Sequence, residues 1–165
     1  MKKITLIISF ITITMVLQAQ TFQWAKKIGG ANTEDGNSVA VDASGNVYTT
    51  GSFQGTVDFD PGVGTYTLSA NSTYGVYLLK LDALGNFVWA QRIAGLGSNA
   101  PLPALTLDAT GNIFVTGGAS FATTTYTCTY YGGKDIFVAK FNGAGNLIWA
   151  KSMGGNMTTL VPLLK

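Results

Sequence analysis

An internal repeat restricts the fold of this chain more than any other feature of its sequence. Four stretches align, and two kinds of stretch alternate along the chain: VAVDASGNVYTTGS (39–52), LKLDALGNFVWAQRI (79–93), LTLDATGNIFVTGG (105–118) and AKFNGAGNLIWAKSMGG (139–155). Asp42 and Asp108 are 66 residues apart, and Gly85 and Gly145 are 60 apart. The larger repeating unit therefore has about 60–66 residues and contains one stretch of each kind.

Each stretch predicts a β-hairpin, because two apolar runs flank a short turn. An acid or amide at the first turn position accepts hydrogen bonds from backbone N–H groups two or three residues on, and a glycine takes the positive φ that closes the loop. The turn residues are Asp42, Asp82, Asp108 and Asn142, with Gly45, Gly85, Gly111 and Gly145. Asn142 would be a poorer calcium ligand than an acid, and the further oxygen ligands of a calcium loop are missing. We therefore expect the acids to brace turns rather than to hold an ion.

The strands around these turns are expected to be covered on both faces, because runs such as VYLLKL (76–81) are apolar on both sides. In the second kind of hairpin, a period of two predicts that Phe87, Trp89 and Ile93 share one face, with Ala90 on the other. The equivalent residues of the next unit are Leu147, Trp149 and Met153, with Ala150 on the opposite face. A large aromatic residue against a small one predicts packing between neighbouring sheets rather than a ligand platform.

Two hairpins per unit give four antiparallel strands, and four-stranded sheets repeated about an axis form a β-propeller. The sequence therefore predicts an all-β fold made of propeller blades. GNSVAVDASGNVYTTGS (36–52), then YGVYLLKLDALGNFVWAQRIAG, and GKDIFVAKFNGAGNLIWAKSMGG (133–155) resemble the bacterial repeat family called SBBP, for seven-bladed β-propeller. The resemblance extends from Phe22 to Gly155. It implies a secreted or surface-exposed propeller with no defined activity and no catalytic residue.

One stretch departs from the pattern of that family. SNAPLPALTLD (98–108) replaces the usual start of the second unit and introduces Pro101 and Pro103. Proline cannot donate a hydrogen bond to a strand ladder. The strand that follows is therefore predicted to be short or to lie at a sheet edge.

The repeat divides the chain into five predicted parts: a signal peptide at 1–20, a last-strand segment of a ring-closing blade at 21–30, a first blade at 31–95, a second blade at 96–155 and a truncated first strand of a third blade at 156–165. Trp24 takes the place of Trp89 and Trp149, as in propellers whose N-terminal strand closes the ring. The spacing puts the next turn acid near position 167 or 168. We expect an N-terminal fragment with about two complete blades and an incomplete ring. The alternative is a complete short protein that oligomerises. Two units alone are expected to leave two open faces and to associate through open blade edges.

The first twenty residues predict a secretory signal peptide. Lys2 and Lys3 precede an uncharged run from Ile4 to Leu17, which is too short to span a bilayer, and a small residue follows at Ala19. We expect contact with a membrane only during export and a secreted or cell-surface bacterial protein. Removing the two lysines leaves 8 basic and 8 acidic residues, so the mature chain has no net charge. Nucleic acid is therefore not expected as a partner.

The composition excludes several kinds of chemistry. Histidine is absent and Cys128 is the sole cysteine, which excludes an intrachain disulfide, zinc sites built on histidine or several cysteines, and Ser-His-Asp or Cys-His catalysis. We predict no catalytic, cofactor-binding or metal-binding residue. In DFDPG, Asp58 and Asp60 could hold a cation, but we favour a strand that ends in an Asp-Pro-Gly turn.

The remaining candidates concern binding. Tyr126, Tyr130 and Tyr131 could stack on a sugar or a partner protein, although tyrosine is also an ordinary strand former. The prediction is a non-catalytic module that acts as a scaffold, adhesion or ligand-binding unit for an unknown protein or glycan. The alternative is a fragment of a secreted enzyme that acts on glycans or peptides. Its catalytic residues would lie elsewhere, because this sequence shows no evident pair of catalytic carboxylates and Glu34–Asp35 are expected in a connection.

Overall fold

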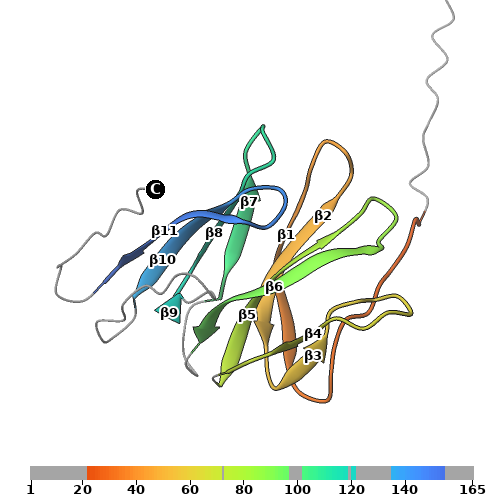
Figure 1. The fold of residues 1–165 in the computed structure, drawn as a ribbon, viewed down its shortest axis with the longest axis horizontal. Coiled ribbons are helices and arrows are strands. Elements are labelled where there is room, and N and C mark those ends of the chain that lie inside the picture. The colour runs from red at the N-terminus through yellow and green to blue at the C-terminus, as the bar shows by residue number, and fades with distance from the viewer. Residues whose placement is uncertain (1–21, 72, 97–101, 119, 122–134, 155–165) are drawn as a thin grey trace, which may run out of the picture.

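The described part of the chain consists of β-strands and their connections. The computed structural model describes residues 22–71, 73–96, 102–118, 120–121 and 135–154, and these residues contain no helix. They form two antiparallel sheets that lie side by side and one small hairpin that lies over the first sheet (Figure 1). The predicted all-β fold is confirmed. No described helix could cross a bilayer.

The first sheet contains both hairpins of the first unit. Its strands are β1 (Glu34–Val41), β2 (Val47–Phe53), β5 (Tyr74–Leu81) and β6 (Phe87–Leu96), in the order β1-β2-β5-β6. A fifth strand, β9 (Ser120–Phe121), comes from the second unit and pairs with Ala94 and Gly95 on β6. The repeat pattern did not predict this addition, because β9 has only two residues.

The second sheet repeats this arrangement. Its strands are β7 (Ala104–Leu107), β8 (Ile113–Gly117), β10 (Ile136–Phe141) and β11 (Leu147–Met153), in the order β7-β8-β10-β11. β7 has four residues, follows Pro103 directly and forms one edge of the sheet, whereas its counterpart β1 has eight residues. The prediction of a short or edge strand after the prolines is confirmed.

The core between the two sheets is continuous. Its buried residues from the first sheet are Tyr48, Val76, Leu78, Ile93 and Ala94, and those from the second sheet are Ile113, Val115, Phe137, Ala139, Phe141 and Ala150. Most of these side chains are aliphatic or aromatic and wholly buried, so removing them from water favours the stacking of the two sheets. The prediction that the strands are covered on both faces holds for residues 76–81 of β5, whereas Val39 and Val41 of β1 are exposed.

The other face of the first sheet is covered by a hairpin, which corrects the expectation of two open faces. β3 (Thr56–Asp58) pairs with β4 (Thr67–Ser69), and both lie over the sheet (Figure 1). The Phe59 ring lies 5.2 Å from the Phe53 ring and 5.0 Å from the Tyr77 ring, centroid to centroid. The aromatic residues of this segment form a second core, which the repeat pattern did not predict.

A break in register corrects the predicted aromatic face. On β5, Lys80 pairs with Trp89 and Leu81 pairs with Phe87, so Val88 is an extra residue in β6. Trp89 consequently packs against the core between the sheets together with Ile93, whereas Phe87 packs on the opposite face with Ala90. The prediction was right for Trp89 and Ile93 and wrong for Phe87. The same shift separates Leu147 from Trp149, because Lys140 pairs with Trp149 and Phe141 with Leu147.

The segment before β1 forms no strand. Residues 22–33 have no regular secondary structure, and they lie against the hairpin-covered face, where Trp24 and Ile28 pack on the core. An outermost strand needs a sheet edge with which to pair, and no described edge accepts this segment. Ring closure by residues 21–30 therefore stays a prediction, as do the other predicted boundaries.

Candidate functional site

The repeated turns hold their first side chain by the same hydrogen bonds. In the first turn, the backbone N–H groups of Ser44 and Asn46 donate to Asp42 Oδ1, each at 2.9 Å. The Asn46 side-chain amide donates to Asp42 Oδ2 at 2.8 Å. The N–H of Gly45, with a φ of +81°, donates to the Asp42 carbonyl at 3.0 Å. Both carboxylate oxygens are thus engaged inside the turn.

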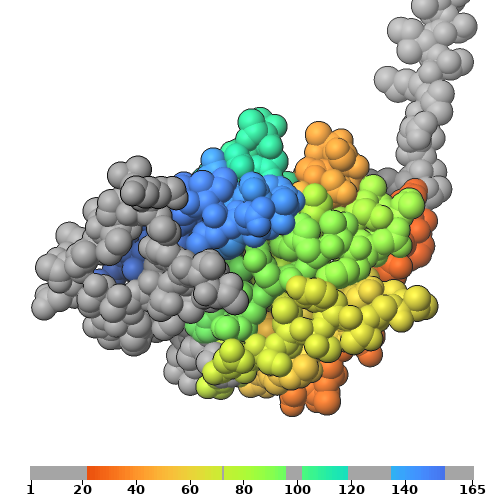
Figure 2. Space-filling model, viewed as in Figure 1, coloured from red at the N-terminus to blue at the C-terminus, as the bar shows by residue number. Residues whose placement is uncertain are grey.

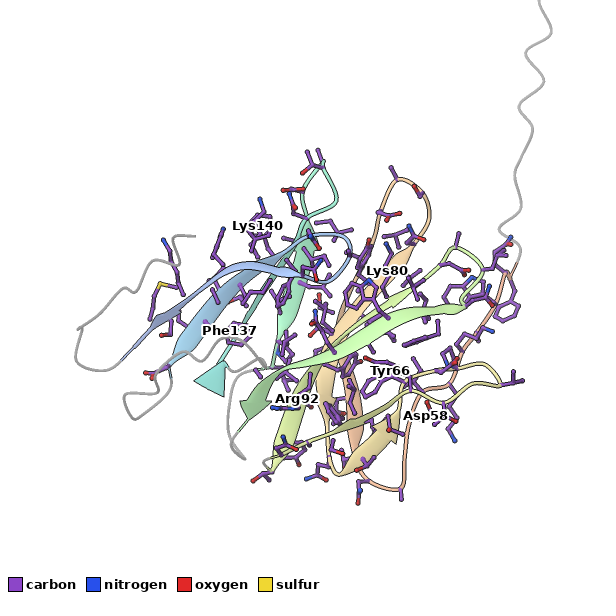
Figure 3. All side chains as sticks on the ribbon, in the orientation of Figure 1. Asp58, Tyr66, Lys80, Arg92, Phe137 and Lys140 are labelled. Carbon is purple, nitrogen blue, oxygen red and sulfur yellow. The ribbon has the colours of Figure 1, made fainter. Side chains whose placement is uncertain are left out.

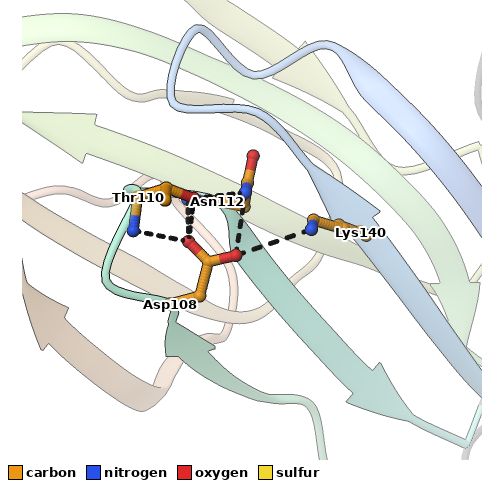
Figure 4. Close-up of polar contacts among 4 residues, drawn as sticks. All are labelled: Asp108, Thr110, Asn112 and Lys140. Atoms are coloured by element: carbon orange, nitrogen blue, oxygen red, sulfur yellow. Dashed lines mark hydrogen bonds and ion pairs between the residues drawn. The ribbon is translucent and has the colours of Figure 1, made fainter.

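The other turns confirm the predicted structural role and correct its detail. Asp82 accepts bonds from the N–H groups of Leu84 and Asn86 at 2.8 Å, and Asp108 accepts the equivalent bonds together with the Thr110 hydroxyl at 2.7 Å (Figure 4). The donors are two and four residues on, not two or three. Asn142 keeps the two backbone bonds, from Ala144 at 3.1 Å and from Asn146 at 2.9 Å.

Sequence reasoning missed the role of the asparagine that ends each turn, which is to hold the first residue of the turn by hydrogen bonds. Its side chain donates to the second carboxylate oxygen at Asp42, Asp82 and Asp108, at 2.8–2.9 Å. Its backbone also closes the turn in all four copies, because its carbonyl accepts the N–H of the first residue at 2.9–3.0 Å. The signal was present in the sequence, since Gly-Asn recurs in every turn.

These hydrogen bonds keep the turn carboxylates ionised. The side chains of Asn112 and Thr110 hold the pKa of Asp108 well below its ordinary value. The backbone N–H of Asn86 does the same for the pKa of Asp82. Burial raises the pKa of Asp42, but the bonds that it accepts outweigh burial, so its pKa is also lowered. The Asp108 carboxylate has an additional partner, because Lys140 Nζ lies 3.5 Å from Oδ2 (Figure 4).

Turns of the second hairpin kind are covered by a tryptophan from the preceding part of the chain. Gly145 has a φ of +84°, and a Cβ built there would lie 3.2–3.3 Å from ring atoms of Trp89. Gly85 has a φ of +76°, and its Cβ would lie 2.9–3.0 Å from ring atoms of Trp24. By contrast, Gly111 has a φ of +79°, and in the described part of the chain nothing lies within 4 Å of its Cβ position. Glycine at the covered turns is therefore required both for its conformation and for its lack of a side chain.

Polar contacts accompany this packing between the two sheets. Gln91 Nε2 donates to the Gly145 carbonyl at 2.8 Å, and Lys80 Nζ donates to the Gly143 carbonyl at 3.3 Å. The Lys80 ammonium also lies 5.0 Å from the centre of the Tyr48 ring, on the side of the first sheet that faces the second (Figure 3). The turn 142–146, blue in Figure 2, lies against the green surface of β5 and β6.

The two tryptophans differ in one hydrogen bond. Trp24 Nε1 donates to the Ala83 carbonyl at 3.1 Å, whereas Trp89 Nε1 is buried and has no partner among the described residues. Gly143 is the counterpart of Ala83, and its carbonyl already accepts the Lys80 bond.

The innermost strands of the two sheets are joined by one hydroxyl group. Ser38 lies after a bulge in β1, and its Oγ lies 3.1 Å from the Leu105 nitrogen and 3.3 Å from the Leu105 oxygen. The hydroxyl accepts from the first and donates to the second. This bridge connects β1 and β7, which are edge strands of the two sheets and correspond to the innermost strands of propeller blades.

The DFDPG insert forms the turn that we favoured. Asp58, which lies near Tyr66 (Figure 3), accepts on its Oδ1 the N–H groups of Asp60 at 3.0 Å and of Tyr66 at 2.8 Å. Asp60 Oδ1 accepts the N–H of Gly62 at 2.8 Å. The bond from Tyr66 is the main reason that the pKa of Asp58 is lowered. The described residues contain no group of three or more His, Cys, Asp or Glu side chains placed to hold a metal ion.

The remaining candidates are not brought together with these turns. The prediction that Glu34 and Asp35 lie in a connection is wrong, because they begin β1 and pair with β2; the Ser52 hydroxyl lies 3.5 Å from Asp35 Oδ2. Cys128 and the tyrosines at 126, 130 and 131 lie outside the described residues. The structure therefore leaves the predicted tyrosine surface as a prediction.

The architecture and two sequence comparisons define the class of protein. Antiparallel four-stranded sheets that repeat along the chain and pack face to face are typical of propeller blades. Residues 23–52 match the family described as a beta-propeller repeat, SBBP. An uncharacterized WD repeat-containing protein of Acanthamoeba polyphaga mimivirus is 28% identical over 170 residues, which cover 84% of this chain and 12% of that protein. The chain is therefore a β-propeller repeat protein, and it spans only a small part of the length of this relative.

Proposed function

We propose that the chain is a secreted or cell-surface, non-catalytic propeller module that acts as a scaffold, adhesion or ligand-binding unit. The observation that carries the proposal is that the repeated turn carboxylates are engaged in hydrogen bonds within their own turns. The carboxylates of Asp42, Asp82 and Asp108 each accept hydrogen bonds from their own turn on both oxygens. A general acid or nucleophile needs an oxygen that is directed at a substrate. These groups instead stabilise a rigid framework.

The packing supports a scaffold role. The turn 142–146 of the second sheet is held by Trp89, Gln91 and Lys80 of the first sheet, and Ser38 joins the innermost strands. A framework held at several points can present variable loops in fixed positions, which is how rigid β-scaffolds commonly bind partners. The ligand we propose is a protein or a glycan, and Tyr126, Tyr130 and Tyr131 are the candidate residues for its contact.

The location and the wider architecture rest on the sequence. The charged start and apolar run of residues 1–20 favour export by a bacterial cell. The resemblance to SBBP repeats favours a ring of about seven blades, in which each of the two described sheets is one blade. The alternative, a secreted enzyme that acts on glycans or peptides, would place its catalytic residues outside the described part of the chain.

Export and binding test the proposal in sequence. The full chain, expressed in a bacterial host, is expected to leave the cytoplasm, and the mass of the exported protein should correspond to cleavage near Ala19. The exported protein is then applied to immobilised glycans and peptides, and both retention and product release are measured. Retention without product supports the module. A protein that stays in the cytoplasm contradicts the proposed location. An activity that releases product and that copurifies with the protein contradicts the non-catalytic role.

A further inference from the structure

The outer face of the second sheet repeats the residues by which the first sheet holds a turn. Four positions correspond between the sheets: Phe114 to Tyr48, Lys140 to Lys80, Trp149 to Trp89 and Lys151 to Gln91. We call Phe114, Lys140, Trp149 and Lys151 the outer-face set. Its residues come from β8, β10 and β11.

The geometry of the outer-face set is already formed. The Phe114 and Trp149 rings meet edge to face at 6.2 Å, and the Tyr48 and Trp89 rings do so at 6.3 Å. Lys140 Nζ lies 4.9 Å from the centre of the Phe114 ring, close to the 5.0 Å between Lys80 and Tyr48. Among the described residues, no turn covers Trp149, and the Lys151 ammonium lies 5.9 Å from its ring. The two rings and Lys140 thus already have the arrangement of their counterparts in the first sheet.

The residue two positions after each covering tryptophan matches the charge of the turn beneath. Lys26 follows Trp24, and its Cε would lie 3.1 Å from a Cβ at Gly85, in the turn that begins with Asp82. The backbone bond from Asn86 is the main reason that the pKa of Asp82 is lowered, and the charge of Lys26 contributes. Gln91 follows Trp89, and the turn beneath begins with the neutral Asn142. A cation therefore accompanies an acidic turn, and an amide accompanies a neutral one.

We propose that the outer-face set is a docking site for a D-x-x-G-N hairpin turn from a further unit of the same repeat, with an acid rather than an asparagine at its first position. Trp149 would cover the positive-φ glycine, because Trp24 and Trp89 do so at Gly85 and Gly145. Lys151 would lie beside the acid, because Lys26 occupies that place at Asp82. The inference goes beyond the proposed function and does not depend on it, since it concerns how units join and not what the module binds.

The probe is a head-to-tail cyclised peptide with residues 79–90, closed by D-Pro-Gly across the Leu79 and Ala90 pair. A second peptide carries Asp82→Asn. Fluorescence anisotropy measures the binding of each labelled peptide to the exported full chain. We expect the acidic peptide to bind about two- to fivefold more tightly, as one exposed charge pair allows.

Three variants of the chain complete the test. Trp149→Ala should weaken binding of the acidic peptide by at least about tenfold, as the loss of an aromatic anchor predicts. Trp24→Ala is the matched control and should leave peptide binding unchanged. Lys151→Gln should remove the preference for the acidic peptide while both peptides still bind. Circular dichroism and thermal melting confirm that each variant folds.

Several outcomes would overturn the proposal. They are equal affinity of the chain for both peptides, no binding of either peptide at millimolar concentration, and binding that survives Trp149→Ala. Sedimentation velocity tests whether a second copy of the chain occupies this face instead. Self-association that requires Trp149 and that the peptide does not compete with would assign the face to a second copy of the chain, and would likewise overturn the proposal.

Discussion

The two sheets carry the same tryptophan at the same position, but its surroundings differ. Trp89 of the first sheet packs against the core between the sheets and covers Gly145 of the second. Trp149 of the second sheet contacts Phe114 and Lys151, which belong to its own sheet. The difference teaches that the face of the first sheet that carries Trp89 is completed by a turn from the second sheet and not by residues of its own. The turn has two tasks, since it both connects two strands and fills the neighbouring face.

The largest loss of stability is expected from removing Trp89, the tryptophan that packs on the turn of the second sheet. Trp89→Ala should destabilise the chain by about 3–5 kcal/mol, because a large ring is lost from a packed contact. Trp149→Ala should change the free energy of unfolding by less than about 1 kcal/mol, since its ring has fewer partners. Urea denaturation followed by circular dichroism measures both. Equal losses in the two variants would break the comparison between the sheets.

The next largest difference in stability is expected between substitutions at Gly145, which lies under the Trp89 ring, and at Gly111, which does not lie under a ring in the described structure. Gly111→Ala should cost about 1–2 kcal/mol, which is the penalty for placing an L-residue in the left-handed region. Gly145→Ala has the same conformational penalty and also brings a methyl group against the Trp89 ring, so about 1–3 kcal/mol more is expected. Thermal and urea unfolding of the two variants provide the measurement. A difference of zero would mean that the ring moves aside freely.

A smaller effect is expected at the innermost strands. Ser38→Ala removes the hydroxyl that bridges β1 to the Leu105 backbone and should cost about 1 kcal/mol. Ser44→Ala is the control, because the structure records a bond from the Ser44 backbone and the substitution retains that bond. The control should lie within about 0.5 kcal/mol of the parent chain. If both variants unfold alike, the bridge between the innermost strands contributes nothing measurable.

The smallest effect concerns pH and sharpens the comparison between acidic and neutral turns. The pKa of Asp108 is lowered in the folded chain, so its contribution to stability is complete above the ordinary carboxyl pKa near about 4 and is lost as the pH falls towards the folded value. Asp108→Asn should therefore make the unfolding midpoint less dependent on pH below about 4. Asn142→Ala is the control, because the residue removed there does not titrate. Parallel pH profiles of the Asp108 variant and the parent would contradict this role of the carboxylate.

Part of this structure was predictable from local sequence. The turns were, because the acid, the glycine and the asparagine all act within five residues, and their hydrogen bonds join only residues of the same turn. The short β7 was too, since Pro103 directly precedes it. Such features depend on neighbours in the chain and so appear in the sequence itself.

The rest depends on contacts between distant residues. The extra residue Val88 places Phe87 and Trp89 on opposite faces, and a simple period of two does not reveal a bulge. The cover formed by β3 and β4 depends on Phe59 meeting Phe53 and Tyr77, which only the folded sheet brings together. The contact of Trp89 with Gly145 joins residues in different sheets, so neither hairpin predicts it alone.

A double-mutant cycle tests most directly whether the turn 142–146 of the second sheet completes the face of the first sheet. The free energy of unfolding is measured for the parent, Trp89→Ala, Gly145→Ala and the double variant. If the ring rests on Gly145, the steric part of the glycine substitution disappears when the ring is absent, and the coupling energy should be about 1 kcal/mol or more. Additive losses, with a coupling energy near zero, would contradict the claim that the turn and the tryptophan form one contact.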